Sequence, residues 1–315
     1  MSLDVATRAI LDQLAEASGR PLVDCTPEEA RAMKASVATL AGPGPAMMSV
    51  EDHRVPVAGG EVPLRVFIPP QGARAVMVYL HGGGWVIGSI DWLDTMARKL
   101  AERMSCAVAL VGYRLAPEHR YPIAADDCYA ALEWAHRSLE EMTGRSDAPL
   151  VVAGDSAGGN LAAVTALRAR DRGGPPIALQ VLIYPITDAD LDTPSYLDPE
   201  NQLLLTRTDM VWFWDHYAPD PDRRFEPDAS PLRARSLAGL PPAVVMTAEH
   251  DVLRDEGEAY AERLAREGVP VDFRRHAGQT HGFFTLLLLP GSERGFQQVV
   301  KAVRACIVRH APGRD

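Results

Sequence analysis

The chain has 315 residues, of which 47% are hydrophobic and 23% charged, with a formal net charge of −10. This composition is that of a globular protein able to bury a sizeable core. The acidic balance, with its charges interspersed, argues against nucleic acid or an anionic membrane as partner and favours a neutral small molecule. The four cysteines show no metal-ligand spacing, so we expect reduced thiols in a cytoplasmic protein.

No secretory or membrane-spanning segment is expected. The N-terminus lacks a basic segment followed by an apolar stretch. The longest strongly apolar run, Phe283 to Leu289, falls far short of the ~20 residues of a membrane span.

The first elements in chain order are helices. Residues 1–45 show helical spacing of apolar side chains, and Thr26-Pro27-Glu28-Glu29 has the pattern of a capping box. The breaker sequence 41–45 predicts a hinge into a main domain at 46–315. A hairpin is expected next, with strands at 55–57 and 62–68 around Ala58-Gly59-Gly60.

Short apolar runs then alternate with helical patterns. Strands are predicted at 75–80, 107–111, 150–153, 177–184, 243–247 and 271–274, and helices near 93–104, 123–141, 157–170, 255–267 and 293–308. This alternation predicts an α/β fold whose mostly parallel sheet carries helices on both faces. The stretch 188–230 breaks the rhythm with a helix start at Thr208-Asp209, so we expect a cap insertion there, the alternative being an ordinary core helix.

The predicted strand at 150–153 runs into Gly154-Asp155-Ser156-Ala157-Gly158. This G-x-S-x-G pattern is typical of a nucleophile elbow, a strained strand-to-helix turn that exposes the serine hydroxyl. The N–H of Ala157 would lie at a helix N-terminus, free to bind an oxyanion. Because such a pattern also occurs in plain Gly-rich turns, the assignment of Ser156 depends on its partners.

A serine nucleophile needs a base that is oriented by a third group, and α/β-hydrolases supply the acid and then the histidine after later strands. Asp251 and His281 each follow a predicted strand, at the edge where ligands bind in parallel sheets. His276 is a minor alternative base because it falls at the end of a strand. Asp255 is a weaker alternative acid because it lies in a helix start.

His81-Gly82-Gly83-Gly84-Trp85 follows the predicted strand at 75–80. Residues without side chains let backbone N–H groups approach a tetrahedral intermediate closely, so this stretch is a candidate oxyanion loop. Phosphate binding is disfavoured because neither a Gly-Lys-Ser/Thr sequence nor a helix-opening G-x-G-x-x-G is present.

Five motifs in order carry a resemblance to a known family. They are His81 to Gly84, Tyr113 to His119, Gly154 to Asn160, Asp251 to Gly257 and His281 to Phe283. From about residue 45 onward the chain resembles the hormone-sensitive-lipase-like esterases, the bacterial family IV enzymes of the α/β-hydrolase fold. Where that family commonly has proline after the catalytic acid, this chain has Val252.

The resemblance implies an eight-stranded, mainly parallel sheet and a cap built from the N-terminal helices plus the insertion. It also implies hydrolysis of short- to medium-chain carboxylic esters without a metal or organic cofactor. Ser156 would be the nucleophile, His281 the base and Asp251 its orienting acid. The N–H groups of Gly83, Gly84 and Ala157 would be the oxyanion donors, although the sequence leaves open which two of the three loop glycines act. Structural roles are preferred for the segment Tyr113 to His119, which would tie its loop beside the oxyanion loop, and for Asp155, which would be a partner of the helix N-terminus.

Several points stay open. The candidates for lining the substrate pocket, with plain packing as the alternative, are Trp85, Tyr184, Trp212, Trp214 and Phe283. Cleavage of lactones, amides or carbamates would use the same triad, and a non-catalytic small-molecule receptor is disfavoured because all three triad residues are present. An exposed edge strand near 271–274 would allow a homodimer.

Overall fold

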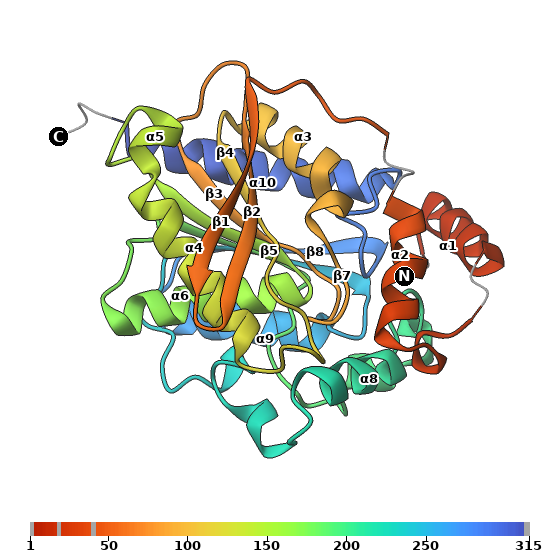
Figure 1. Ribbon diagram of the computed structural model, residues 1–315. Helices are drawn as coiled ribbons and strands as arrows, with labels where there is room; N and C mark the ends of the chain where they lie inside the picture. The colour runs from red at the N-terminus through yellow and green to blue at the C-terminus, as the bar shows by residue number, and fades with distance from the viewer. Residues whose placement is uncertain (1–2, 18–19, 39–41, 312–315) are drawn as a thin grey trace.

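In a computed structural model, which describes residues 3–17, 20–38 and 42–311, eight strands form one sheet (Figure 1). Its order is β1-β2-β4-β3-β5-β6-β7-β8. The strands are β1 (Ser49–Val57), β2 (Gly60–Ile68), β3 (Val76–Leu80), β4 (Ala107–Val111), β5 (Leu150–Asp155), β6 (Leu179–Ile183), β7 (Ala243–His250) and β8 (Val271–Thr280). Only β2 runs antiparallel to its neighbours in this described sheet, which confirms the mostly parallel sheet predicted above.

Helices cover both faces of the sheet (Figure 1). On one face lie α3 (Asp94–Met104) and α10 (Pro290–Arg309); on the other lie α4 (Ile123–Arg137), α6 (Ala157–Arg172) and α9 (Arg254–Arg266). Side chains alternate along each strand, so Val78 of β3 packs in one core and its neighbours Met77 and Tyr79 pack in the other. The two buried cores fix the position of the central strands and of the loops that follow them.

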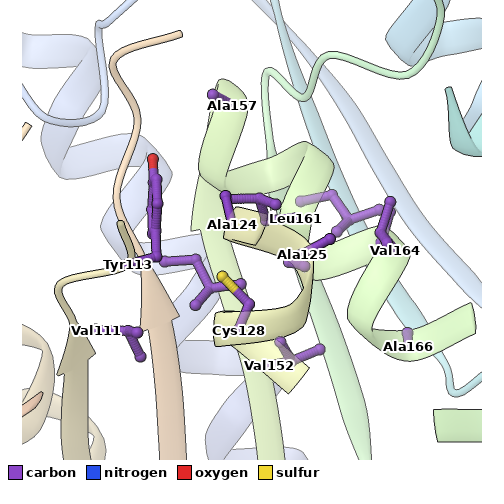
Figure 2. Close-up of a cluster of buried hydrophobic side chains, with 14 of the residues drawn as sticks. Val111, Tyr113, Ala124, Ala125, Cys128, Val152, Ala157, Leu161, Val164 and Ala166 are labelled. Carbon is purple, nitrogen blue, oxygen red and sulfur yellow. The ribbon is translucent and has the colours of Figure 1, made fainter. Parts of the chain in front are cut away.

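Small side chains bring α4 and α6 together over the sheet. Figure 2 shows Ala124, Ala125 and Cys128 of α4 in one cluster with Leu161 and Val164 of α6. Short side chains allow a close approach of the two helices, which holds α6 firmly against β5. The start of α6 is thereby fixed relative to the end of β5, and Ser156 lies between them.

Some predicted boundaries were wrong. β8 continues to Thr280, six residues beyond the predicted end, and therefore includes His276. The predicted helix at 123–141 is divided at Ser138 into α4 and α5 (Leu139–Thr143). Both strands of the hairpin are longer than expected, and they are joined at Val57 and Gly60.

Two segments distant in sequence lie together beyond the carboxyl ends of the parallel strands (Figure 1). One contains α1 (Val5–Ala17), the short η1 (Leu22–Asp24) and α2 (Pro27–Ala38); the other contains α7 (Pro194–Leu197) and α8 (Arg207–Tyr217), and η1 packs on α8. The capping box of α2 is present, with Thr26 and Glu29 bonding to each other's backbone N–H. The N-cap of α8 is Thr206 and not the predicted Thr208. Among the helices of the described ranges, none combines the length and apolar character that a bilayer crossing requires.

Candidate active site

Ser156 lies at a sharp turn between β5 and α6. Its backbone angles are φ 56° and ψ −120°, a strained conformation for a residue with a side chain. The turn needs small neighbours: a Cβ on Gly154 would lie 2.2 Å from the carbonyl oxygen of Gly158, and one on Gly158 would lie 2.0 Å from that of Leu80. This is the geometry of a nucleophile elbow, and it explains the glycines on both sides of the serine.

The structure brings Ser156, His281 and Asp251 together in one hydrogen-bonded chain. His281 Nε2 lies 3.0 Å from Ser156 Oγ, and His281 Nδ1 lies 2.8 Å from Asp251 Oδ2. The other oxygen of Asp251 accepts the N–H of Leu253 at 3.0 Å, and the carboxylate is buried. With Nδ1–H donating to Asp251, Nε2 of a neutral imidazole faces the serine hydroxyl as an acceptor.

The alternative residues lie elsewhere. His276 is buried within β8, where Nε2 lies 3.3 Å from Gln298 Oε1 and its ring packs on Phe283. Burial lowers the pKa of His276 to about 4. Asp255 accepts the N–H of Ser195 at 2.7 Å and pairs with its neighbour in sequence. The structure thus places neither residue in the chain of hydrogen bonds at Ser156.

The Gly-rich loop after β3 has an unusual backbone. Gly83, Gly84 and Trp85 have φ values of 111°, 57° and 61° in succession. The carbonyl of Gly83 accepts the N–H groups of Val86 at 3.1 Å and Ile87 at 2.9 Å, which closes a tight turn. Within the described part of the chain, the N–H groups of Gly83, Gly84 and Ala157 donate to no protein acceptor. They are therefore available to a negatively charged oxygen.

Asp155 connects the elbow to this loop. Its Oδ1 accepts the hydroxyl of Tyr79 at 3.0 Å and the N–H of Gly82 at 3.1 Å. Burial raises the pKa of Asp155 to about 6, although both hydrogen bonds oppose the increase. Asp155 was expected to be a partner of the helix N-terminus, but its contacts show a different role: its carboxylate holds Gly82, the residue before Gly83 and Gly84 of the candidate oxyanion loop.

His81 and Tyr113 support the same loop from inside the protein. The two rings stack at 4.2 Å, and the Tyr113 hydroxyl donates to the His81 carbonyl at 2.7 Å. Burial lowers the pKa of His81 to about 4, so the imidazole is neutral at neutral pH. Arg114 makes a bidentate pair with buried Asp127 of α4, Nε donating to Oδ2 and Nη2 to Oδ1. These contacts agree with the structural roles preferred for the segment Tyr113 to His119.

Four of the five aromatic pocket candidates are buried. Trp85, Trp214 and Phe283 expose none of their surface, and Tyr184 exposes 1%. Of the five candidates only Trp212 is half-buried. Packing, the alternative left open above, is the role that the contacts show for Trp85, Trp214 and Phe283.

Sequence reasoning missed Phe213, which lies against the oxyanion loop. A Cβ on Gly84 would fall 2.1 Å from the ring of Phe213, so this glycine leaves room for the aromatic side chain. Phe213 stands between the two tryptophans that were singled out, and the run Trp212-Phe213-Trp214 offers no signal that selects the middle residue. A helix turn of about 100° per residue places the three rings in different directions.

Comparisons with known proteins agree with this geometry. The profile of a family described as alpha/beta hydrolase fold matches residues 77–285. The carboxylic ester hydrolase LipN of Mycobacterium tuberculosis is 42% identical over 85% of this chain and 73% of its own length. The chain belongs to this family. Its motifs place it among the hormone-sensitive-lipase-like esterases, which are carboxylic ester hydrolases.

Other relatives agree in sequence and in structure. Ethyl acetate hydrolase of Pseudomonas putida is 37% identical over 88% of this chain and 89% of its own length. A hyperthermophilic esterase from the archaeon Pyrobaculum calidifontis superposes with a TM-score of 0.91 at 38% identity, covering 99% of this chain and 100% of the other. The α/β-hydrolase fold predicted from the motifs is thereby confirmed.

Proposed function

We propose that this esterase cleaves its substrate through an acyl-enzyme on Ser156. The observation that carries the proposal is the hydrogen-bonded chain from Ser156 Oγ through His281 to Asp251, with distances of 3.0 and 2.8 Å. Nucleophilic catalysis by a serine requires a base within hydrogen-bond reach of the hydroxyl and a third group that orients the base. His281 and Asp251 meet these two requirements.

The reaction follows from these contacts. His281 Nε2 takes the hydroxyl proton as Ser156 Oγ attacks the ester carbonyl, and Asp251 stabilises the imidazolium that forms. The N–H groups of Gly83, Gly84 and Ala157 bind the oxyanion of the tetrahedral intermediate. When the intermediate collapses, His281 returns the proton to the leaving alcohol. Water then attacks the acyl-enzyme by the same route and releases the acid.

The substrates that we propose are uncharged esters with short- to medium-chain acyl groups, and a cap formed by α1, α2 and the insertion at 188–230 shapes their pocket. Support comes from Phe213 of α8, which lies against Gly84 and limits the space beside the oxyanion loop. A relative named for ethyl acetate hydrolysis agrees with a small ester. Trp212 and Tyr184 are the candidates from the sequence that remain for this pocket.

A phosphonate ester and a substrate series test the proposal. The phosphonate should label Ser156 and abolish hydrolysis of p-nitrophenyl butyrate, and Ser156→Ala should lower kcat by at least about 10⁴-fold. The matched control is Ser138→Ala, at the junction of α4 and α5, which should keep full activity. Labelling at another residue, or activity in Ser156→Ala, would overturn the assignment of the nucleophile.

The alternative reactions are separated by matched substrates. Because lactones, amides and carbamates would use the same triad, p-nitrophenyl esters from acetate to dodecanoate should be compared with the corresponding anilides and with simple lactones. We expect kcat/KM to be highest for the esters and to decline at the long-chain end. A preference for an anilide or a lactone would show that ester cleavage is a side activity.

We also propose a cytoplasmic protein able to form a homodimer. The cysteines support the first point, because all four are buried, unpaired thiols in the described structure. The edge strand β8 supports the second, because its residues 272–275 are exposed and it pairs within the sheet with β7 alone. Light scattering with a Phe273→Lys variant tests the pairing, and a wild-type monomer would refute it.

A further inference from the structure

Arg31 of α2 reaches from the N-terminal segment to the backbone of the oxyanion loop. Its Nε donates to the carbonyl of Val86 at 2.9 Å, and its Nη2 donates to the carbonyl of Ala116 at 2.8 Å. Both Nη atoms also pair with the carboxylate of Glu118, at 2.8 and 2.7 Å. One guanidinium therefore joins two loops that follow neighbouring strands, β3 and β4.

The two loops are also joined by their own backbones. The N–H of Ala116 donates to the carbonyl of Trp85 at 3.0 Å. The carbonyls of Trp85 and Val86 are therefore both held, the first by Ala116 and the second by Arg31. These two residues directly follow Gly83 and Gly84, whose N–H groups are the candidate oxyanion donors.

This loop needs external support because its backbone is strained. Trp85 has a φ of 61°, in a region that disfavours any residue with a Cβ. A strained turn persists only where its surroundings determine it. On the side-chain side Trp85 stacks on Tyr217 of α8 at 4.2 Å. On the backbone side the carbonyls of Val86 and Trp85 are held from outside the loop by Arg31 and Ala116.

We propose that Arg31 is a positioning residue for the oxyanion hole, which it aligns by holding the Val86 carbonyl and, through Ala116, the Trp85 carbonyl. The inference rests on the proposed function, in which this loop supplies oxyanion donors. The planar guanidinium fork of arginine, with its fixed donor directions, suits this task because it can donate to a carboxylate and two carbonyls at once. Lysine offers no such fork.

Glu118 orients the guanidinium in turn. The hydrogen bond from Arg31 lowers the pKa of Glu118 to about 2, so the pair stays charged through any ordinary assay range. The Glu118 side chain is about half exposed, so water screens the ion pair and its own contribution to stability is small. The effect of Arg31 on the loop is therefore expected to come mainly from the two bonds to backbone carbonyls.

The test compares Arg31→Ala and Arg31→Lys with the wild type, using active sites titrated with the phosphonate. A displaced oxyanion donor affects the transition state more than the bound ester. We therefore expect kcat per titrated site to fall on the order of 10-fold to 100-fold in Arg31→Ala. KM should change by less than about twofold, and a trifluoromethyl ketone that forms a tetrahedral adduct should bind weaker by the same factor as kcat falls.

The conservative variant and a control separate positioning from general stability. Arg31→Lys should recover less than half of the lost activity on a logarithmic scale, because it keeps the charge without the fork. Arg103→Ala removes a comparable bidentate pair, between α3 and Glu293 of α10, and should leave kcat unchanged. Glu118→Gln keeps both hydrogen bonds from Arg31 to carbonyls and should lower kcat less than Arg31→Ala does. It gives a second measurement of the effect if Arg31→Ala folds poorly.

The outcomes are distinguishable. If Ser156 is labelled normally while Arg31→Ala keeps its kcat and its affinity for the ketone, the role of Arg31 is refuted and the proposed function stands. A variant that only lowers Tm or the titrated fraction, with normal kcat per site, also refutes it. If Ser156 is not the labelled residue, the proposed function fails, and this inference fails with it.

Discussion

Asp155→Asn should change how the stability of the protein depends on pH. Asp155 as a residue is 6% exposed, and burial raises the pKa of its carboxyl from an ordinary 3.8 to about 6. Asparagine has nearly the same shape and keeps an oxygen that can accept from the Tyr79 hydroxyl and the Gly82 N–H. The substitution therefore removes the titration while it preserves an acceptor for the loop.

The sign follows from proton binding. Because the folded pKa is higher than the unfolded one, the folded state binds the proton more tightly, and the free energy of unfolding falls as pH rises from about 4 to about 6. A difference of about two pKa units corresponds to about 3 kcal/mol. That cost is absent below pH 4, is complete above about pH 7, and should be missing in Asp155→Asn.

The pH dependence of stability is measured by urea unfolding of the wild type and Asp155→Asn at several values between pH 4 and pH 8. As pH rises across that range, the variant should become more stable relative to the wild type by about 3 kcal/mol of unfolding free energy. Asp147→Asn is the matched control, because Asp147 is exposed and its pKa is lowered by a hydrogen bond from Arg145. If Asp155→Asn and the wild type give parallel curves, the carboxyl is not a buried titrating group and the reasoning is wrong.

Other substitutions test packing and acid sensitivity. Gly84→Ala should lower kcat on the order of 10²-fold, because the added Cβ would overlap the Phe213 ring. The double variant with Phe213→Ala should recover part of that activity, and no recovery would exclude the overlap as the cause. Trp85→Ala should lower the free energy of unfolding by about 3–5 kcal/mol in urea, and an altered acyl-chain preference at unchanged stability would restore its assignment to the pocket. Burial lowers the pKa values of His81 and His276 from 6.5 to about 4, so between these values the unfolded chain binds protons more tightly, and the free energy of unfolding falls as pH drops from about 6.5 to about 4. In urea titrations His276→Gln should make this fall less steep, and an unchanged slope would contradict the assignment.

Most of the fold could be predicted from the order of the apolar runs and the helical patterns along the chain. The parallel strands β3 to β7 are short apolar runs buried on both faces, and all six strands predicted after the hairpin are present. The positions of Ser156, Asp251 and His281 could be inferred because each directly follows a strand. Parallel strands bring such positions to one edge of a sheet, so residues distant in sequence could be expected to meet.

Side-chain direction was much harder to infer. Trp85 follows three glycines in a loop at the site, which suggested a pocket residue, yet its positive φ turns the ring into the core against Tyr217. Phe213 stands between two other aromatic residues, Trp212 and Trp214, so the sequence does not single it out. What distinguishes it is the absence of a side chain at Gly84, and that contact depends on how α8 docks. Local sequence carries no record of such long-range contacts.

Three successive residues of the oxyanion loop are held by elements far from it in sequence. Phe213 lies on Gly84, Tyr217 stacks on Trp85, and Arg31 binds the carbonyl of Val86. The triad, by contrast, depends on the ends of β5, β7 and β8, which pair within one sheet. Because these three contacts come from α2 and α8, we expect both helices to be docked before the N–H groups of Gly83 and Gly84 are aligned. With α2 and α8 undocked, a chain with a complete sheet would keep the proposed triad and the N–H of Ala157 but would lack aligned donors from Gly83 and Gly84, and we expect it to be a poor esterase.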